Sequence, residues 1–260
     1  IRPTGFLHLG NYFGAMRNYV KMQETHTCFF MVADLHSLTT HPDTTELKKN
    51  VQRVIAENIA CGLNPEKVAL YCQSHLYETS ELYLYLNMLA YKGELEKTAT
   101  FKDKARLHPQ NINAGLLTYP VLMATDILIH RASYVPVGKD QEQHLEMTRN
   151  FAQRFNHRYG DVFPEPMAFN FGETLLKVPS LDGTGKMSKS ESQMATLYLA
   201  DDDESIRKKL MKAVTGEAPA EKNSVMPDSV ANLFLLMELV STQEVIAPYK
   251  NDYSNCRIRF

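Results

Sequence analysis

Cys28-Phe-Phe-Met-Val-Ala33 is a short apolar run that decides the fold class. Runs without alternation between polar and apolar positions are typical of strands buried on both faces of a sheet. Val68-Ala-Leu-Tyr-Cys-Gln73 is a second such run, and residues 133–137 form a third. Between the first two, residues 43–62 carry apolar side chains at helical spacing. Strands that alternate with helices predict an α/β domain built around a parallel sheet.

The helix expected over residues 43–62 has recognisable ends. Asp43-Thr-Thr-Glu46 has the spacing of a capping box, and Gly62 ends the apolar periodicity. Further helices are predicted over residues 79–93, from there to about residue 104, over 114–130 despite Pro120, over 140–157 and over 229–240.

The texture of the sequence changes in its last third. Prolines and glycines punctuate residues 164–185, and beyond residue 195 the pattern predicts helices alone. In residues 201–209 acidic side chains precede basic ones, as the dipole of a solvated helix favours. We therefore predict an α/β domain over residues 1–195 and an all-α domain over residues 196–260.

The composition is that of an ordinary globular protein. Of 260 residues, 44% are hydrophobic and 22% are charged, which excludes collagen-like and disordered chains. No apolar run reaches the ~18 residues of a transmembrane helix. The formal net charge of -2 means that a nucleic-acid partner would be met by a local basic patch. The four cysteines form no CxxC pair or Cys/His cluster, which favours reduced thiols in the cytoplasm and no metal site.

Glycines punctuate the first motif, Gly5-Phe-Leu-His8-Leu-Gly10-Asn11-Tyr-Phe-Gly14, which leads into a helical pattern. Glycine at a helix start lets a ligand approach the bare backbone, whose free N–H groups favour phosphate. His8 and Asn11 add donors that can follow charge developing on a phosphate oxygen. The alternative is a Gly-rich turn with a structural role only.

A second motif, Gly183-Thr-Gly185-Lys186-Met-Ser-Lys189-Ser190, combines two glycines with two lysines and two serines. The glycines predict a mobile loop, and the polar side chains predict a clamp for a polyanion. Solvated surface lysines are the alternative.

The third motif, Gly138-Lys139-Asp140-Gln141, directly follows the apolar run at 133–137. Open parallel sheets bind ligands at the carboxyl ends of their strands, where a carboxylate can accept both hydroxyl groups of a ribose.

Asp126 lies in the middle of an apolar helical stripe. At 100° per residue, its side chain falls about 20° from Tyr119 and about 60° from Met123. A carboxylate on an apolar face costs on the order of several kcal/mol unless it is paired or used. Two interpretations are open. Asp126 either pairs with His130, one turn away, or forms the base of a pocket for a flat apolar ligand with an N–H or O–H group.

Taken together, these motifs resemble those of the class I aminoacyl-tRNA synthetases. His8-Leu-Gly10-Asn11 is similar to the HIGH motif in its HxGN form, and Lys186-Met-Ser-Lys-Ser190 matches KMSKS letter for letter. Within this class, residues 1–215 resemble the bacterial tryptophanyl-tRNA synthetases. The blocks that carry this closer resemblance are Pro3-Thr-Gly5, Val32-Ala-Asp34-Leu-His36, Thr118-Tyr-Pro120-x-Leu-Met123-Ala-x-Asp126 and Val135-Pro-Val-Gly-x-Asp140-Gln-x-x-His144-x-Glu-x-Thr-Arg149.

The resemblance implies a Rossmann-like parallel-sheet catalytic domain, followed by an α-helical domain that binds the tRNA anticodon and continues beyond residue 260. It implies that L-tryptophan attacks the α-phosphate of ATP, bound with Mg²⁺, to give tryptophanyl-adenylate and pyrophosphate. The tryptophanyl group then passes to tRNA(Trp). The resemblance also implies a cytoplasmic protein that forms a homodimer and does not bind a membrane. Residues 82–89 suit either the dimer interface or a helix buried in the core.

Residue roles follow from the motif match. For tryptophan the resemblance implies Asp126 as acceptor of the indole N–H, Gln141 at the polar end of the amino acid, and a lining of Tyr119, Met123, Ile127, His36, Val135 and Val137. For ATP it implies Arg2, Pro3, Thr4, Gly10, Asn11, Gly138, Lys139, Asp140, Val178, Lys186, Met187, Ser188, Lys189 and Ser190. The implied catalytic residues are His8, Asn11, Lys104, Lys186 and Lys189.

Two other functions stay open. The related tyrosyl-tRNA synthetases share the fold and the motifs, but they would need polar groups for a phenol hydroxyl in place of Asp126 beside Tyr119 and Met123. A synthetase-like protein that binds RNA or an amino acid without catalysis is the second alternative, and the intact HxGN and KMSKS motifs argue against it.

Overall fold

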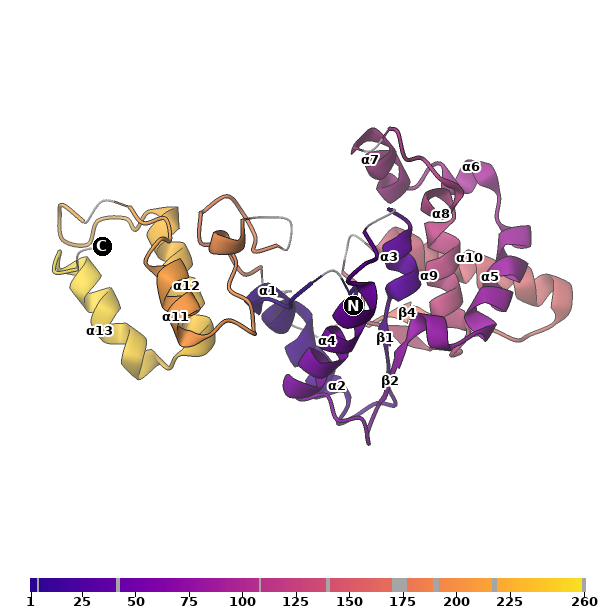
Figure 1. The fold of residues 1–260 in the computed structure, drawn as a ribbon, viewed down its shortest axis with the longest axis horizontal. Helices are drawn as coiled ribbons and strands as arrows, with labels where there is room; N and C mark the ends of the chain where they lie inside the picture. The colour runs from indigo at the N-terminus through magenta and orange to yellow at the C-terminus, as the bar shows by residue number, and fades with distance from the viewer. Residues whose placement is uncertain are drawn as a thin grey trace. The chain divides into compact units, whose positions relative to one another are not determined.

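The computed structural model describes residues 1–3, 5–40, 43–107, 109–138, 141–169, 177–188, 192–216 and 219–258. Figure 1 shows the elements of the chain in order. The helices of the first half are α1 (Leu9–Asn11), α2 (Arg17–Met22), α3 (Asp34–Leu38), α4 (Leu47–Ala60), α5 (Glu78–Leu89), α6 (Lys92–Leu95), α7 (Ala99–Leu107), α8 (Ala114–Leu117) and α9 (Tyr119–Leu128). Those of the second half are α10 (Glu142–Tyr159), α11 (Asp203–Leu210), α12 (Asp228–Val240) and α13 (Gln243–Ser254).

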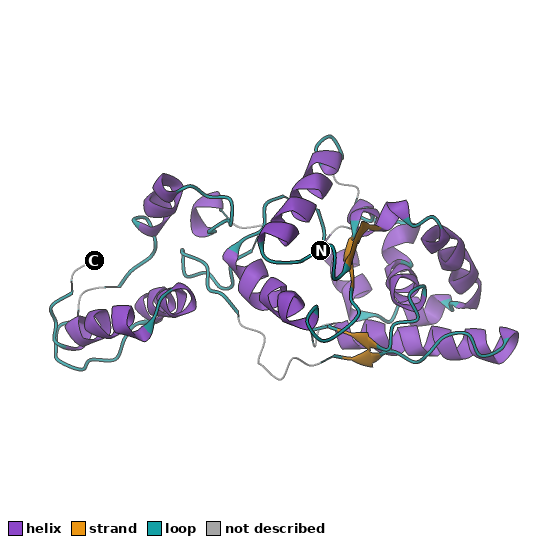
Figure 2. Cartoon of the chain, turned by 90° about the horizontal axis from the view of Figure 1, so that it is seen from below, coloured by secondary structure: helices purple, strands orange, loops and turns teal. Residues whose placement is uncertain are grey.

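Two pairs of parallel strands form where the apolar runs predict strands (Figure 2). Strand β1 (Phe29–Val32) pairs with β2 (Ala69–Cys72), so that Phe29 lies opposite Ala69 and Val32 opposite Cys72. Strand β3 (Tyr134–Val135) pairs with β4 (Met167–Ala168). The three predicted strands are confirmed, but their predicted burial on both faces is wrong, since Phe29, Ala69 and Tyr134 are exposed. The short strand β4 was not predicted, because two residues between prolines and a polar loop carry no periodicity.

Helix α4 begins later than the sequence predicts. The Asp43 carboxylate accepts hydrogen bonds from the Thr45 backbone N–H at 2.9 Å and from the Thr45 hydroxyl at 2.6 Å, and the helix begins only at Leu47. The predicted capping box is therefore wrong, since Asp43 closes a turn ahead of the helix. Gly62 ends the helical segment as predicted, with a φ of +110° that favours glycine.

The single helix predicted over residues 114–130 is divided in two. Helices α8 and α9 meet at Thr118, and Pro120 lies in the first turn of α9. Proline has no backbone N–H to donate, so it is tolerated in a first turn and would interrupt the hydrogen bonds of one continuous helix.

The first motif opens a helix with an unusual geometry. Helix α1 continues as a π-helical turn over Tyr12–Met16 and then as α2. A π turn holds one extra residue in its hydrogen-bonded ring and often occurs at functional sites.

The described residues pack as two units. The first comprises Ile1–Thr4, Thr25–Ala56 and Asn64–Thr174, and the second comprises Gly5–Glu24, Glu57–Leu63 and Leu175–Phe260. The core of the first unit contains Leu86, Leu89, Leu95, Val121, Ala124, Leu128, Phe151 and Ala152 from α5, α6, α9 and α10. The second unit has two clusters, one around Val178 and Leu236 and one around Phe234 and Tyr253. The predicted domain division at residue 195 stays a prediction.

The described residues after 200 fold into the three helices α11, α12 and α13, as the sequence predicts for this part of the chain. Asp202 caps the start of helix α11, where its carboxylate accepts a hydrogen bond from the Ser205 N–H at 2.7 Å. Among the described residues, we find no helix with both the length and the apolar character that a membrane crossing requires.

Candidate active site

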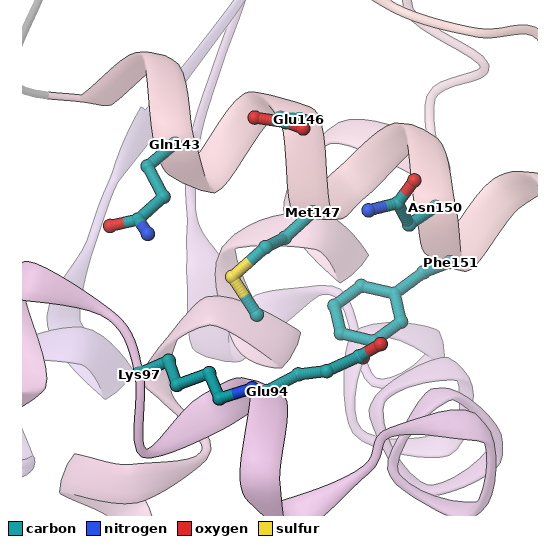
Figure 3. Close-up of a pocket in the computed structure, with 7 residues that line it drawn as sticks. All are labelled: Glu94, Lys97, Gln143, Glu146, Met147, Asn150 and Phe151. Carbon is teal, nitrogen blue, oxygen red and sulfur yellow. The ribbon is translucent and has the colours of Figure 1, made fainter.

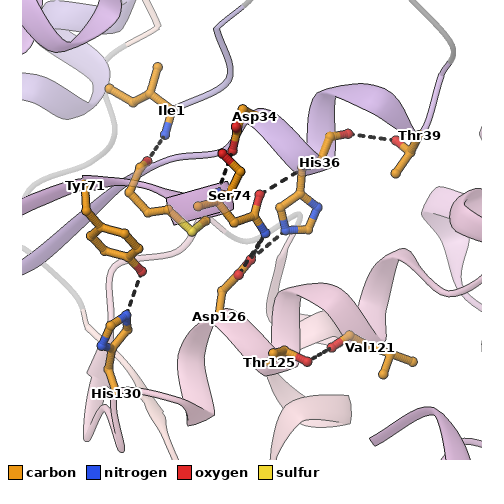
Figure 4. A network of polar contacts seen from close by, with 12 residues as sticks. Ile1, Asp34, His36, Thr39, Tyr71, Ser74, Val121, Thr125, Asp126 and His130 are labelled. Carbon is orange, nitrogen blue, oxygen red and sulfur yellow. Dashed lines mark hydrogen bonds and ion pairs between the residues drawn. The ribbon is translucent and has the colours of Figure 1, made fainter. Parts of the chain in front are cut away.

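Asp126 belongs to a buried polar network at the carboxyl ends of β1 and β2 (Figure 4). The Nε2 atom of His36 lies 2.7 Å from Oδ2 of Asp126. The Gln73 amide donates to Oδ1 of Asp126 at 2.8 Å and to Oδ2 at 3.1 Å. Gln73 in turn accepts a hydrogen bond from the His36 backbone N–H at 3.2 Å. The three residues therefore close a ring of hydrogen bonds that fixes the orientation of the carboxylate.

The alternative in which His130 pairs with Asp126 is wrong. The Nε2 atom of His130 lies 2.6 Å from the Tyr71 hydroxyl (Figure 4). The His130 ring stacks on Phe29 with centroids 4.5 Å apart. Burial lowers the pKa of His130 and outweighs the opposite effect of the Asp126 charge. The partners of the carboxylate come instead from the two strand ends.

Asp34 ties these strand ends together. Its Oδ1 atom accepts a hydrogen bond from the Ser74 backbone N–H at 3.1 Å (Figure 4). Burial alone would raise the pKa of Asp34, but hydrogen bonds from Ser74 and Cys72 lower it below its ordinary value. Gln73, which is fully buried, lies between these two residues in the chain.

Tyr119 forms an aromatic wall beside the network. Its ring lies 4.6 Å from that of His36 and 5.8 Å from that of His144, measured between centroids. The ammonium group of Lys104 lies over the same ring, 4.7 Å from the centroid. Burial, and then the nearby charge of Arg2, lower the pKa of Lys104. The site thus places a partly desolvated cation beside an aromatic surface.

Gln141 is connected to this wall through His144. Its side-chain oxygen lies 2.8 Å from Nδ1 of His144, and its backbone N–H donates to the Gly138 carbonyl at 2.9 Å. The first unit therefore brings together most of the polar residues predicted to bind tryptophan. Among the predicted apolar lining, Ile127 is buried, whereas Met123, Val135 and Val137 are half-buried.

The HxGN motif in the second unit is a compact turn. The His8 backbone N–H donates to the Asn11 side chain at 3.0 Å, and the Asn11 N–H donates to the His8 carbonyl at 2.8 Å. A Cβ atom added to Gly10 would lie 2.9 Å from the His8 ring and 3.5 Å from the Met187 carbonyl. Glycine at this position therefore lets the His8 ring lie against the helix start, close to the backbone of the second motif.

A hairpin leads into the KMSKS motif. The Met187 N–H donates to the Val178 carbonyl at 2.8 Å, and the Ser180 N–H donates to the Gly185 carbonyl at 3.0 Å. Asp182 accepts hydrogen bonds from the hydroxyl groups on either side of it, and these bonds lower its pKa. Val178 and Met187 are buried in an apolar cluster, whereas Lys186 is exposed. The side chains of Val178 and Met187 therefore support the hairpin from within.

The remaining predicted ATP residues are only partly described. Pro3 is buried, and Arg2, Gly138 and Ser188 are half-buried. Five predicted residues lie outside the described part of the chain, namely Thr4, Lys139, Asp140, Lys189 and Ser190.

Gln73 is the site residue that sequence reasoning missed. It is the last residue of the apolar run over residues 68–73. A polar residue at the carboxyl end of a buried parallel strand is the same signal that drew attention to Asp140. Applied to the second strand, that signal would have found Gln73.

A separate hollow lies against helices α6 and α10 (Figure 3). Met147 and Phe151 point from α10 toward Glu94, which is paired with Arg154. The hollow is also lined by Lys97, Gln143, Glu146 and Asn150, and it includes no residue predicted to bind tryptophan or ATP.

Comparison with known protein families matches residues 1–257 to the tRNA synthetases of class I that are specific for W and Y. The chain belongs to this family. It is 59% identical over 261 residues to the tryptophan–tRNA ligase of Porphyromonas gingivalis, an alignment that covers 100% of this chain and 79% of that protein. It is 43% identical over 249 residues to the tryptophan–tRNA ligase of Caldanaerobacter subterraneus subsp. tengcongensis, covering 94% of this chain and 75% of that protein.

Solved structures agree with this assignment. The tryptophanyl-tRNA synthetase of Campylobacter jejuni, complexed with ADP and tryptophan, matches with a TM-score of 0.84 and 33% sequence identity. The match covers 97% of this chain and 77% of that one. The predicted class I synthetase fold, with its Rossmann-like catalytic domain, and the predicted tryptophan–tRNA ligase function are confirmed.

Proposed function

We propose that the chain activates L-tryptophan with ATP, releases pyrophosphate and transfers the tryptophanyl group to tRNA(Trp), with Asp126 as the residue that recognises indole. The observation that supports this proposal is the set of hydrogen bonds to the Asp126 carboxylate. Among the described residues, hydrogen bonds from His36 and Gln73 use three of the roughly four lone-pair positions of the carboxylate and leave one on Oδ1. An indole N–H, which only donates, fits that position. A phenol hydroxyl also accepts hydrogen bonds and would need a donor beside it.

The tautomer of His36 follows from the same network. Oδ2 of Asp126 is an acceptor, so Nε2 of His36 carries the proton between them. Nδ1 of His36 is buried, and no hydrogen-bond partner for it exists among the described residues. We therefore place the proton between the two side chains on Nε2 of His36. The ring then donates to the carboxylate and orients it.

The rest of the first unit would hold the amino acid for attack on ATP. Tyr119 offers an aromatic face to the indole ring, and Met123, Ile127, Val135 and Val137 supply apolar lining. Gln141, anchored by His144, would hold the polar end of tryptophan. Lys104 would face the α-phosphate, where its charge stabilises the negative charge that develops on the oxygens. Burial and the nearby charge of Arg2 lower the pKa of Lys104, and a bound phosphate would supply a compensating negative charge.

The second unit would hold the triphosphate. The backbone at Gly10, the donors of His8 and Asn11, and the exposed Lys186 are suited to phosphate oxygens. By motif, Ser188, Lys189 and Ser190 would take the leaving pyrophosphate, Gly138, Lys139 and Asp140 the ribose, and Val178 the adenine. We propose that Mg²⁺ enters with ATP, because it prefers phosphate and water oxygens. Neither step needs a covalent enzyme intermediate, since positioning and charge stabilisation suffice.

The exposed side of α5 supports a homodimer. Tyr77, Leu84 and Met88 are 82%, 55% and 72% exposed, and Tyr85 and Tyr91 extend the same apolar surface. Leu86 and Leu89 on the opposite side of the helix are buried in the core. One side of the helix therefore packs in the core, and the other side is an exposed apolar surface. Exposed apolar surfaces of this kind often bind a partner protein. Met88→Glu should shift the protein from dimer to monomer in sedimentation analysis, whereas an unchanged mass would contradict the proposed interface.

A cytoplasmic location fits the cysteines. Cys28, Cys61, Cys72 and Cys256 are all free thiols, as a reducing compartment maintains them.

The absence of Trp from the chain provides a direct binding test. Indole fluorescence excited beyond the absorption of tyrosine must come from bound or free ligand, since the sequence has 13 Tyr and no Trp. A shifted, saturable emission on mixing with tryptophan would report binding. Exchange of pyrophosphate into ATP tests the chemistry. Stimulation of this exchange by tyrosine, but not by tryptophan, would overturn the proposal.

A further inference from the structure

Residues 195–199 pair with the HxGN segment in the second unit. The Leu9 N–H donates to the Leu197 carbonyl at 3.0 Å, and the Leu199 N–H donates to the Leu7 carbonyl at 2.9 Å. His8 and Tyr198 lie opposite each other in this antiparallel bridge. The backbone on both sides of His8 is therefore tied to the same short stretch of chain.

The same stretch also holds the KMSKS hairpin. The Leu181 N–H donates to the Ala195 carbonyl at 2.9 Å. The Thr196 hydroxyl, which is fully buried, donates to the Ser188 carbonyl at 3.1 Å. Residues 195–199 thus form a strut, a short segment that runs from the end of a 3-10 turn at Ala195 to Leu199 and whose hydrogen bonds reach both the first motif and the second.

A buried ion pair anchors the end of this strut. The Lys209 ammonium lies 2.8 Å and 2.6 Å from the two oxygens of Asp201, with side-chain exposures of 8% and 13%. Asp201 also accepts a hydrogen bond from the Tyr198 backbone N–H at 2.8 Å. The Lys209 ammonium lies over the Tyr198 ring, 4.6 Å from its centroid. Lys209 and Asp201 therefore hold both the backbone and the side chain of Tyr198.

A buried ion pair is a poor way to stabilise a fold. Two charges lose their hydration when they are buried, and an apolar pair of similar volume often stabilises a fold as well or better. A buried pair does impose a specific geometry, because each charge needs its partner at hydrogen-bond distance. The geometry imposed here belongs to the segment that joins the two nucleotide motifs.

We propose that Lys209 and Asp201 are positioning residues for ATP. By fixing Tyr198, they fix residues 195–199, and these set the distance between the His8 segment and the KMSKS hairpin. The two groups of proposed phosphate donors are thereby held at a fixed spacing. This inference rests on the proposed function, and it assigns to Lys209 and Asp201 a role that acts through the backbone of the two motifs.

Lys209→Met tests the proposal by separating KM from kcat. Methionine keeps the length and packing of the side chain and removes its charge. We expect the KM for ATP in pyrophosphate exchange to rise about tenfold or more, because a small displacement far from the reacting atoms costs up to about 10²-fold. The KM for tryptophan should not change, since the residues proposed to hold it belong to the first unit.

Lys208→Met is the matched control. Lys208 precedes Lys209 on α11 but is exposed, so removal of its charge should leave both KM values unchanged. Thermal unfolding measured on both variants separates stability from positioning. Lys209→Arg, which restores a charge that can reach Asp201, should recover most of the lost kcat/KM for ATP.

Two results would overturn the proposal. One is a Lys209→Met protein with a lower kcat and unchanged KM values, which indicates only fewer folded molecules. The other is an equal rise of KM for ATP and for tryptophan. If Lys209→Met does not fold, Asp201→Asn keeps an acceptor for the Tyr198 N–H and is judged by the same KM values. Failure of tryptophan to bind the unsubstituted protein would instead contradict the proposed function itself.

Discussion

The two units hold their candidate site residues in place in different ways. In the first unit, side chains bind one another, since Asp126 is bonded to His36 and Gln73. In the second unit, the hydrogen bonds that flank His8 and Met187 run between backbone groups. A side-chain network depends on the chemical identity of its members, whereas a backbone network depends on space. Loss of a polar group at Asp126 or Gln73 should therefore disturb tryptophan binding, and an atom added at Gly10 should disturb ATP binding.

The largest effect is expected for Lys104→Met, since Lys104 would stabilise charge on the reacting phosphate. Removal of such a donor costs about 10²- to 10³-fold in rate. Burial and Arg2 disfavour the charged Lys104, so the variant should unfold at the same temperature as the parent or higher. Pyrophosphate exchange and thermal unfolding measure the two effects. Lys102→Met, at an exposed position of the same helix, is the control and should change neither.

Lys104 also predicts the pH dependence of the exchange rate. The pKa of Lys104 is lowered, so its charge is present at low pH and is lost as the pH rises through the lowered pKa. The rate should therefore fall on the alkaline side at a lower pH than an ordinary lysine would give. Because the unfolded chain retains its proton to higher pH, the free energy of unfolding should rise over that interval. An alkaline limb identical in the parent and in Lys104→Met would contradict the assignment.

Asp126→Ala should have the next largest effect, confined to tryptophan binding. A hydrogen bond to a charged group contributes about 1.5–3 kcal/mol, so tryptophan affinity should fall about 10- to 10²-fold. Discrimination against an analogue methylated at the indole nitrogen should disappear, because no buried acceptor is left unpaired. Fluorescence titration measures both. Equal selectivity before and after the substitution would show that Asp126 has a structural role only.

Gly10→Ala should have a smaller effect, confined to ATP binding. The new Cβ would lie 2.9 Å from the His8 ring, so the ring must move. We expect about a tenfold rise in the KM for ATP, as for a modest misplacement of a contact group. Gly93→Ala is the control, because a Cβ there meets nothing within 4 Å. A changed tryptophan affinity with an unchanged KM for ATP would contradict the proposal that the Gly10 segment binds ATP and the Asp126 network binds tryptophan.

The smallest expected effect is the difference in coupling free energy between two double-mutant cycles. Asp126→Ala and Gln73→Met remove parts of one network, so their effects on tryptophan affinity should depart from additivity by about 0.5–3 kcal/mol. Asp126→Ala and Gly10→Ala belong to separate networks and should add to within about 0.3–0.5 kcal/mol. Equal coupling in both cycles would remove the distinction between the two networks.

Local patterns predicted the parts of the fold that depend on neighbouring residues. The apolar runs at 28–33 and 68–73 became β1 and β2, because short runs rich in β-branched and aromatic residues favour strands. Pro120 was visible in the sequence, but its consequence depends on where the helix begins. Because Thr118 ends α8, Pro120 falls in a first turn, and one predicted helix becomes two.

The polar partners of the site could not be predicted from spacing. His130 lies one helical turn from Asp126, yet its ring turns to Tyr71 on β2. His36 and Gln73 reach the carboxylate from positions 90 and 53 residues away in the chain. Helical periodicity shows which side chains share a face and says nothing about which strand lies against that face. Only the pairing of β1 with β2 brings those two residues together.

The π turn over Tyr12–Met16 has a consequence for chain length. Each residue of an α-helix turns the chain by about 100°, so removing the extra residue would rotate everything before the turn by that angle. His8 and Gly10 would then face away from their present neighbours, while buried Met16 and Met22 kept theirs. A substitution in this turn changes one side chain, whereas a deletion would rotate the whole HxGN motif. The length of this segment is therefore more constrained than its composition.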